Sequence, residues 1–322
     1  MRKTPKFWST RDPSLYSVLL QPLSLVYRLA SWLRRLLNIC PYRPKTPLIC
    51  VGGIAVGGSG KTPVAIEIAK ILRDNNKSYC FLTKGYGGKG KGIIKLGMYN
   101  SDAYVVGDEA LVLFEHGDTF VSKNRVRGLK YIDNHHSYDY IVMDDGLQNP
   151  TFLKNKKVLV IDCKSEFKNN FILPAGPLRE SFSTVIRRGV DIAILIGEDK
   201  DGIADLCARH SVMVTKGVIK PAARGFSGKY IAICGIAHPD KFKKTLVDSG
   251  VDIVKFIDFG DHHSYKDGDL ESLRKTGYNL ITTKKDWVKI RSLNIDKSKI
   301  HVLDIFVDFE DRTILERALL EN

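Results

Sequence analysis

A glycine-rich stretch that ends in a lysine and a threonine is the first part of this sequence that could do chemistry. It reads AVGGSGKT over residues 55–62 and follows the apolar run LICV at 48–51. Glycines let backbone N–H groups surround a polyphosphate, the lysine neutralises the outer phosphates, and the threonine hydroxyl can bind Mg²⁺. The predicted nucleoside triphosphate-binding loop consists of Ala55, Val56, Gly57, Gly58, Ser59, Gly60, Lys61 and Thr62.

This loop departs from the consensus G-x-x-x-x-G-K-[ST], because Ala55 occupies the place of the first glycine. The alternative interpretation is a glycine-rich turn with an exposed lysine. The preceding apolar run and the helical spacing from Pro63 onward favour a strand, a phosphate-binding loop and a helix.

Two consecutive acids end a second apolar run, YDYIVMDDGLQ at 138–148. Asp144 and Asp145 are typical of a Walker B strand, whose carboxylates reach the metal ion bound by Thr62. Paired acids at the end of a strand are common, but together with the glycine-rich loop they predict Mg²⁺-dependent nucleotide chemistry.

Three further sites are ambiguous from the residues alone. Asp108 and Glu109 precede an apolar helix, where acids also serve as helix N-terminal charge, and the residues favour that role. Arg179 in LPAGPLRE could stabilise a transferring phosphoryl group or form a surface salt bridge. The histidine pair in FGDHHSY, which contains His262, is by itself more typical of a structural loop.

A competing signal appears at Thr283-Lys284-Lys285-Asp286, which fits the guanine-reading tetrad [NT]-K-x-D. It lies much further from the Asp144–Asp145 pair than is usual in GTP-binding proteins, so GTP specificity is disfavoured.

Alternating strand and helix patterns from Leu48 onward must position these residues. They predict an α/β fold resembling P-loop NTPases, with a mostly parallel sheet and helices on both faces. We expect an N-terminal apolar and basic helix with its lead-in at residues 1–46, a kinase-like P-loop core at 47–220 and a smaller α/β domain at 221–322.

The charge balance favours acidic partners, because 50 lysines and arginines against 36 acids give a net charge of +14. Nucleic acid, an anionic membrane and a phosphorylated substrate all fit, but no basic and aromatic stacking motif supports a nucleic-acid-dependent ATPase. The six scattered cysteines predict buried reduced thiols and a cytoplasmic compartment. No apolar segment is long enough to span a bilayer.

The N-terminal stretch 14–39 is apolar around most of a helix and carries Trp32, Arg34 and Arg35. Such a helix could lie in a membrane interface or pack on the protein core, and the sequence leaves both open.

Taken in order, these motifs resemble the tetraacyldisaccharide 4'-kinase family, the lipid A 4'-kinases. The resemblance rests on PLSLVYRL, YRPKTPLICVGGIAVGGSGKTP, TKGYGG, VGDEA, DDGLQ, LPAGPLRE, DHHSY and TTKKD, which span nearly the whole chain. The family's loop also lacks the first Walker glycine, and Lys284 stands where the family usually has glutamate, so the guanine-like tetrad has another explanation.

The resemblance implies ATP as phosphate donor, Mg²⁺ as cofactor and the 4'-hydroxyl of a tetraacyldisaccharide 1-phosphate as acceptor. It implies that Asp108 is the catalytic base, assisted by His262, and that Lys61 binds the β/γ-phosphates. Arg179 would bind substrate or transition-state charge. The implied metal ligands are Thr62, Glu109, Asp144 and Asp145.

An anionic glycolipid substrate would place the protein peripherally on the cytoplasmic face of the inner membrane, as a monomer that binds no nucleic acid. The other function that we consider is a membrane-associated P-loop GTPase or ATPase switch.

The sequence departs from the family pattern at four positions. Lys84 replaces the arginine usual in the family, Gly53 a common asparagine, Leu147 a phenylalanine and Asn149 a frequent histidine. These departures bear on substrate details more than on the reaction.

Overall fold

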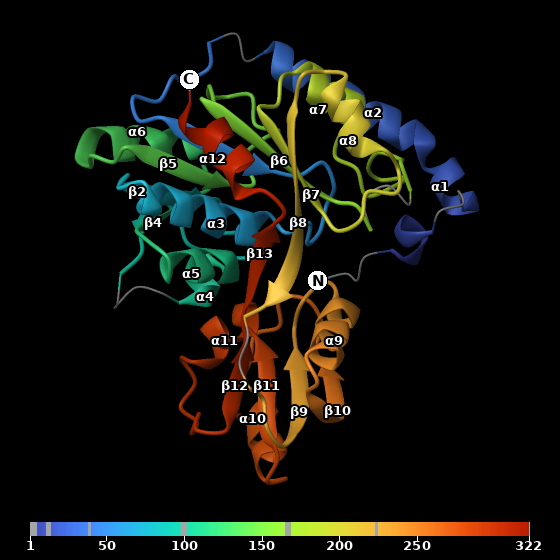
Figure 1. The fold of residues 1–322 in the computed structure, drawn as a ribbon, viewed down its shortest axis with the longest axis vertical. Helices are drawn as coiled ribbons and strands as arrows, with labels where there is room; N and C mark the ends of the chain where they lie inside the picture. Colours follow the sequence, from blue (N-terminus) through green and yellow to red (C-terminus); the bar gives the residue numbers. More distant parts are fainter. Residues whose placement is uncertain are drawn as a thin grey trace. The chain divides into compact units, whose positions relative to one another are not determined.

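The computed structural model describes residues 5–10, 14–37, 40–97, 102–164, 169–222 and 225–321 (Figure 1). The chain divides into two compact units, each assembled from separated segments. We call residues 4–84, 124–219 and 307–322 the large-sheet unit, and residues 85–123 and 220–306 the small-sheet unit. Residues 1–4, 11–13 and 38–39 of the expected N-terminal region lie outside the described residues.

Parallel strands in the order β8-β7-β6-β1-β5-β2 form the sheet of the large-sheet unit. Their bounds are Leu48–Gly52 (β1), Tyr79–Thr83 (β2), Tyr140–Asp144 (β5), Lys156–Asp162 (β6), Ile192–Ile196 (β7) and Met213–Pro221 (β8). Every residue of β1 is buried, as expected for a central parallel strand that is covered on both faces. Since β1 pairs in parallel with β5 in the register Val51↔Asp144, the glycine-rich loop and the paired acids lie together at the C-terminal ends of these strands.

Helices flank this sheet and explain the helical spacing of the sequence. They are η1 (Lys6–Ser9), α1 (Leu15–Leu19), α2 (Gln21–Leu36), α3 (Lys61–Asp74), α6 (Arg125–His135), α7 (Phe182–Arg187), α8 (Ile203–Ala208) and α12 (Arg312–Leu320). Helix α3 buries apolar residues that recur every three or four positions, among them Val64, Ile68 and Leu72. Val185 of α7 and Ile203 of α8 belong to one core cluster with alternate residues of β6 and β7. This arrangement agrees with the predicted α/β class.

The small-sheet unit contains a parallel sheet in the order β10-β9-β11-β12. The strands of this sheet are Lys229–Cys234 (β9), Asp252–Asp258 (β10), Asn279–Thr283 (β11) and Ile300–Leu303 (β12). The unit also contains Ile93–Lys95 (β3) and Thr119–Ser122 (β4), which pair antiparallel with each other outside this sheet. Strand β13 (Ile305–Phe309) begins in this unit's last segment.

Helices cover both faces of the small parallel sheet. They include α9 (Pro239–Asp248), α10 (Asp267–Arg274) and α11 (Lys284–Ile290), and the unit also contains α4 (Ala103–Val106) and α5 (Asp108–Phe114). Tyr230 and Ala232 of β9 pack in one cluster with Phe242 of α9. The alternate residues Ile231 and Ile233 pack in a second cluster with α10 and α11. This two-residue alternation is what a strand buried on both faces requires.

The structure bears on the expected domain boundaries and on the expected burial of the cysteines. The predicted contiguous boundaries near residues 46 and 220 stay a prediction, while residues 85–123 group with 220–306. All six cysteines are free, as expected, but Cys40 is exposed rather than buried. Among the described residues, no helix combines the length and the apolar character that crossing a bilayer requires.

Candidate active site

The glycine-rich loop of the large-sheet unit lies between β1 and the first turn of α3. The backbone N–H of Val56 donates to the carbonyl of Pro177 at 2.9 Å, which ties the loop to the LPAGPLRE segment. Gly60 adopts φ +87° just before α3 begins at Lys61. The free N–H groups and the positive dipole end of a 14-residue helix therefore face the loop, a favourable environment for an anion.

The polar side chains of Ser59, Lys61 and Thr62 make contacts within or beside this loop. The Lys61 Nζ donates to the carbonyl of Gly57 at 3.2 Å and to Ser59 Oγ at 3.1 Å. The Thr62 hydroxyl is buried and donates to Asp144 Oδ2 at 3.0 Å. The structure thus brings together the loop threonine and the first acid of the DDGLQ motif.

Asp145 is held by Arg179 in a two-point interaction. The two terminal nitrogens of Arg179 lie 2.7 and 3.1 Å from the two carboxylate oxygens of Asp145. Burial alone would raise the pKa of Asp145, but the charges of Arg179, Lys61 and Arg125 hold it below its usual value. Arg179 therefore forms a partly exposed salt bridge with the second of the paired acids, and its role in binding a phosphoryl group stays a prediction.

Two residues that the sequence did not single out complete this arrangement. The Arg125 Nη2 donates to the Asp145 carbonyl at 2.7 Å, and Gln148 bridges the Gly53 carbonyl and Arg179. Gln148 belongs to the DDGLQ motif and could have been noticed there. Arg125 starts a helix in another part of the sequence, and nothing in its spacing indicates the contact.

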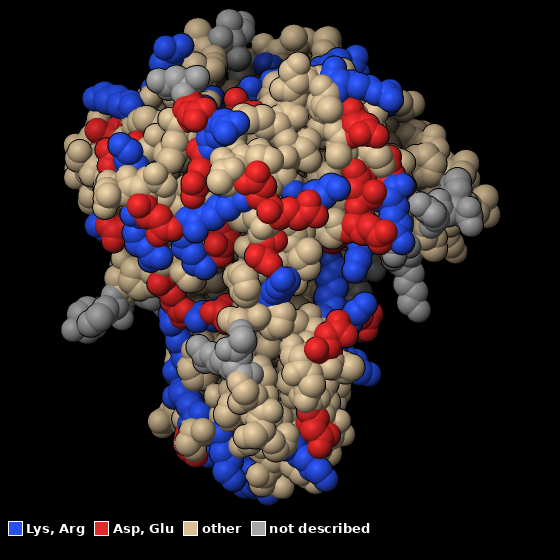
Figure 2. Space-filling model, viewed as in Figure 1, with Lys and Arg blue, Asp and Glu red and all other residues tan. Residues whose placement is uncertain are grey.

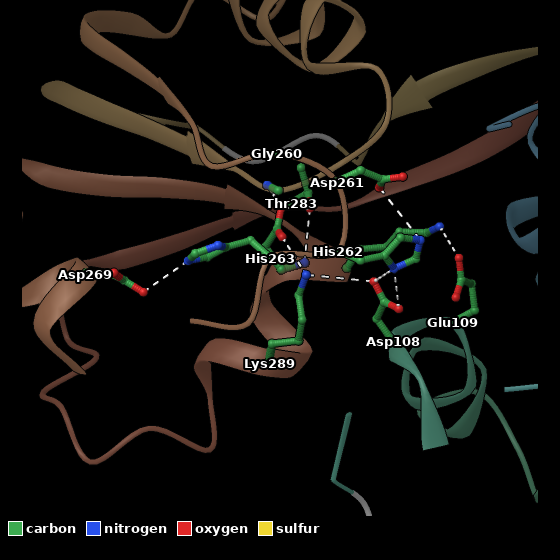
Figure 3. A network of polar contacts seen from close by, with 12 residues as sticks. Asp108, Glu109, Gly260, Asp261, His262, His263, Asp269, Thr283 and Lys289 are labelled. Carbon is green, nitrogen blue, oxygen red and sulfur yellow. Dashed lines mark hydrogen bonds and ion pairs between the residues drawn. The ribbon is translucent and has the colours of Figure 1, made fainter. Parts of the chain in front are cut away.

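Asp108 and His262, 154 positions apart, meet within the small-sheet unit (Figure 3). The His262 Nδ1 lies 2.9 Å from each carboxylate oxygen of Asp108, and their side chains are 16% and 7% exposed. Asp108 is the first residue of α5, directly after Gly107. The backbone of His262 has φ +55°, and its N–H donates to the Gly235 carbonyl at 3.0 Å.

The electrostatics of this pair favour the charged forms of both groups. Burial would raise the pKa of Asp108, but the hydrogen bond with His262 and the charges of His262, Lys285 and Lys289 lower it. The hydrogen bond with Asp108 raises the pKa of His262, against the opposing effect of burial. The arrangement is thus a carboxylate–imidazolium ion pair, in which the imidazolium carries a proton and the carboxylate is ionised.

Glu109 lies beside this pair but has a cationic partner of its own. Its Oε1 is 2.8 Å from Lys285 Nζ, whereas its Oε2 is buried and has no hydrogen-bond partner among the described residues. One donor atom from each of Asp108, Glu109 and His262 lies within 4.8 Å of the others, a spacing that a cation could bridge. The expected metal ligands Thr62 and Asp144 are in contact in the large-sheet unit, whereas Glu109 belongs to the small-sheet unit.

The TTKKD segment has a structural use within the small-sheet unit. Asp286 is fully buried and accepts from Gly235 N at 3.0 Å and Thr283 Oγ1 at 2.7 Å. Lys284 pairs with Glu115 at 2.5 Å. Because a guanine-reading aspartate must reach a base, its complete burial argues against the guanine tetrad.

His263 differs from its neighbour His262 in its surroundings. Its ring stacks on Phe259 at 4.8 Å, and its Nε2 lies 3.1 Å from Asp269 Oδ2. The structural interpretation of the histidine pair therefore applies to His263, while His262 meets Asp108.

Comparison with known proteins gives a consistent result. A sequence model of the family described as tetraacyldisaccharide-1-P 4'-kinase matches residues 16–322. The tetraacyldisaccharide 4'-kinase of Parvibaculum lavamentivorans is 36% identical over 308 residues, covering 92% of this chain and 89% of that protein. That of Rickettsia canadensis is 34% identical, covering 99% and 97%. Among solved structures, LpxK from Aquifex aeolicus in complex with ATP matches with a TM-score of 0.78 and 25% identity, covering 94% of this chain and 98% of that one.

Proposed function

This chain belongs to the tetraacyldisaccharide-1-P 4'-kinase family, and on that premise we propose how its own residues perform the reaction. It is an ATP-dependent kinase of lipid A biosynthesis, which phosphorylates the 4'-hydroxyl of a tetraacyldisaccharide 1-phosphate. The observation that carries the residue assignment is the pairing of a phosphate-type loop with the buried Thr62–Asp144 contact.

The large-sheet unit binds the nucleotide. The loop residues 55–62 and the N-terminus of α3 surround the phosphates with N–H groups, and Lys61 neutralises the β- and γ-phosphates. The contacts of Lys61 with Gly57 and Ser59 keep its ammonium over the loop, where a phosphate would exchange for them.

The residues around Thr62 fit the expected Mg²⁺. A threonine hydroxyl and a buried carboxylate are hard oxygen ligands, and Thr62 and Asp144 already lie in contact. Asp145 would complete the set from its place beside Arg179, and Glu109 remains the fourth expected ligand. When bound, Mg²⁺ supplies charge neutralisation on the transferring phosphoryl group.

The small-sheet unit supplies the base. The carboxylate of Asp108 accepts the proton of the 4'-hydroxyl, and His262 Nδ1 orients that carboxylate and stabilises the charge of the pair. Arg179 keeps Asp145 ionised and adds positive charge that favours a phosphoryl group in transfer.

The N-terminal helices favour attachment to a lipid surface. One side of α2 is fixed to the protein, since Ser24 Oγ donates to the Ile172 carbonyl at 2.7 Å and Arg35 pairs with Glu180 at 2.6 Å. The large apolar side chains exposed on α1 and α2 are Leu15, Tyr16, Val18, Leu19, Leu23, Leu25, Val26, Leu29, Trp32, Leu33 and Leu36. The helix is therefore packed on one side, and its exposed apolar side supports the proposal of a membrane contact.

A row of exposed apolar residues next to arginines is typical of helices that lie in the interface of an anionic membrane. We infer peripheral binding to the cytoplasmic face of the inner membrane, where the acylated substrate would be met. Figure 2 shows basic and acidic side chains interspersed over the visible face, so in this view the net charge is not gathered into one patch. The monomeric state and the absence of a nucleic-acid partner stay predictions.

The test is phosphate transfer from ATP to a purified tetraacyldisaccharide 1-phosphate with Mg²⁺. We expect transfer by the wild type and a loss of about 10²- to 10⁴-fold for Asp108→Ala, the range of a positioned base. Lys61→Ala should lose more, because it removes charge from the nucleotide site. Lys200→Ala, at an exposed pair with Glu198, is the matched control and should be fully active. Hydrolysis without acceptor and a preference for GTP would instead support the nucleotide-driven switch.

A further inference from the structure

A buried lysine lies close to the Asp108–His262 pair, and it has no role in the proposed reaction. Lys289 is on α11, and its side chain is only 9% exposed. Its Nζ lies 3.8 Å from Asp108 Oδ2 (Figure 3). It also lies 3.0 Å from Asp286 Oδ1 and 5.3 Å from the centre of the Tyr265 ring. The ammonium therefore sits between two carboxylates and against an aromatic face.

The position of this ammonium is fixed from the side opposite Asp108. Asp286 has no exposed surface, and Gly235 N and Thr283 Oγ1 hold its Oδ2. Asp286 is thus an anchored anion, and Lys289 lies one helical turn after it. A lysine that is buried needs compensating charge, and Asp286, Asp108 and the Tyr265 ring supply it.

Two lysines of α11 contact different acids of α5. Lys285 and Lys289 are four positions apart, on the same side of the helix. Lys285 pairs with Glu109, while Lys289 faces Asp108, the residue before it. Each of the two consecutive acids that begin α5 is thereby matched to one lysine of α11.

We propose that Lys289 is a positioning residue for phosphoryl transfer, whose anchored ammonium holds the Asp108 carboxylate in the orientation that meets His262 Nδ1. The proposal rests on the proposed function, in which Asp108 is the base. It goes beyond that function in assigning a task to the TTKKD helix, which supplies an anchored cation and not a nucleotide-reading motif. A carboxylate displaced by about 1 Å can cost about 10²-fold in rate, so the orientation matters to the reaction.

The alternative role for Lys289 is purely structural: it would only neutralise the buried Asp286. The two roles separate in a double variant. Lys289→Met keeps the length of the side chain and removes its charge, and Asp286→Asn with Lys289→Met removes both charges of the anchor. Lys275→Met, which removes an exposed ion pair with Glu271 in the same unit, is the matched control.

The readouts are kcat, KM for ATP, thermal unfolding and the ¹⁵N-histidine NMR spectrum at one fixed pH. We expect Lys289→Met to lower kcat by about 10²-fold with KM for ATP within about 2-fold of the wild type. The Nδ1 resonance of His262 should shift, and the double variant should recover the unfolding temperature but neither kcat nor the resonance. Lys275→Met should behave as the wild type in every readout.

Recovery of both kcat and the His262 resonance in the double variant would overturn the proposal in favour of the structural role. A kcat of Lys289→Met within 2-fold of the wild type would overturn it too. The NMR readout needs no turnover, so a shifted resonance in a protein whose wild type transfers no phosphate would refute the proposed function while retaining the contact between Lys289 and the pair.

Discussion

Asp108 and Asp145 each meet a basic side chain from a distant segment. Asp108 meets His262, and Asp145 meets Arg179 in a bidentate pair. In both cases burial penalises the carboxylate charge and the partner more than offsets that penalty, so the pKa is lowered. The acids therefore stay ionised at neutral pH, which the proposed roles of Asp108 as base and Asp145 as metal-site carboxylate require.

Replacing Asp108 with asparagine should lower the pKa of His262. The hydrogen bond and charge of Asp108 raise that pKa in the folded protein, and their removal leaves the smaller effects of Glu109 and Asp261 to oppose burial, which favours the neutral ring. Titration of ¹³C-labelled histidine by NMR would measure the change, with His262→Gln identifying the resonance. An unchanged or higher His262 pKa in Asp108→Asn would contradict the pairing.

For individual residues, the sequence predicted which side chains could belong to the site better than it predicted which side chains they contact. The glycine-rich loop and the Asp144–Asp145 pair are local patterns, so spacing alone predicts them. Asp108 was ambiguous from the residues, because an acid at a helix start has an ordinary structural explanation. Only the resemblance to a family linked it to His262. Arg125 and Lys289 had no local signal, because their roles depend on which elements pack together.

At the scale of elements, the start of α5 is packed tightly against its own unit. Gly107 has φ +85°, and a Cβ at this position would lie 2.4 Å from the Tyr86 carbonyl oxygen. A Cβ at Gly85 would lie 2.5 Å from the Val106 carbonyl oxygen. The backbone of the KGYGG segment thus lies directly on the turn that presents Asp108, which explains why glycines occur on both sides.

Gly107→Ala should therefore destabilise the protein far more than Gly92→Ala. Both glycines have positive φ, but no atom of the part of the chain that the structure describes lies within 4 Å of a Cβ at Gly92. We expect about 1 kcal/mol for Gly92→Ala, from conformation alone. Gly107→Ala adds the backbone overlap and should cost several times as much, with a loss of kinase activity. Urea unfolding of both variants checks this, and equal losses would show that contact with Tyr86 is unimportant.

The order of strands and helices could be read from the sequence because most strands are continuous apolar runs. The sequence segments KVLVID at 157–162, DIAILI at 191–196 and DIVKFID at 252–258 form β6, β7 and β10 to within one residue. The helix predicted from Pro63 begins at Lys61, since Gly60 can adopt the conformation that precedes a helix start there. The short strands β3 and β4 were not anticipated, because a three- or four-residue strand leaves little periodicity.

For the molecule as a whole, the proposed site residues are distributed over both units. The loop, Asp144, Asp145 and Arg179 belong to the large-sheet unit, whereas Asp108 and His262 belong to the small-sheet unit. Residues 85–123 group with the C-terminal sheet although they lie between segments of the large-sheet unit. Sequence patterns alone predict contiguous domains. They do not show that an internal segment such as 85–123 packs with a sheet formed much later in the chain.

The proposed membrane attachment belongs to the whole molecule, and we expect the exposed side of α2 to control it. Replacing Leu25, Leu29 and Trp32 together with serine should strongly reduce co-sedimentation with anionic vesicles, because each buried apolar side chain contributes about 1.5–3 kcal/mol. The unfolding temperature should change little, since all three side chains are exposed. Val247→Ser with Val254→Ser, at exposed apolar positions of the small-sheet unit, is the control. Undiminished vesicle binding by the triple variant would contradict an interfacial role for α2.

His262 and Asp145 share a backbone feature whose consequence is energetic. Both adopt φ +55°, a left-handed conformation in which a side chain other than glycine is strained by roughly 1–3 kcal/mol. The protein therefore gives up stability at two positions to aim an imidazole and a carboxylate. His262→Gly and His262→Ala both lose the ring, but only alanine keeps the strained Cβ. The glycine variant should be the more stable of the two inactive proteins, by about 1 kcal/mol in urea unfolding.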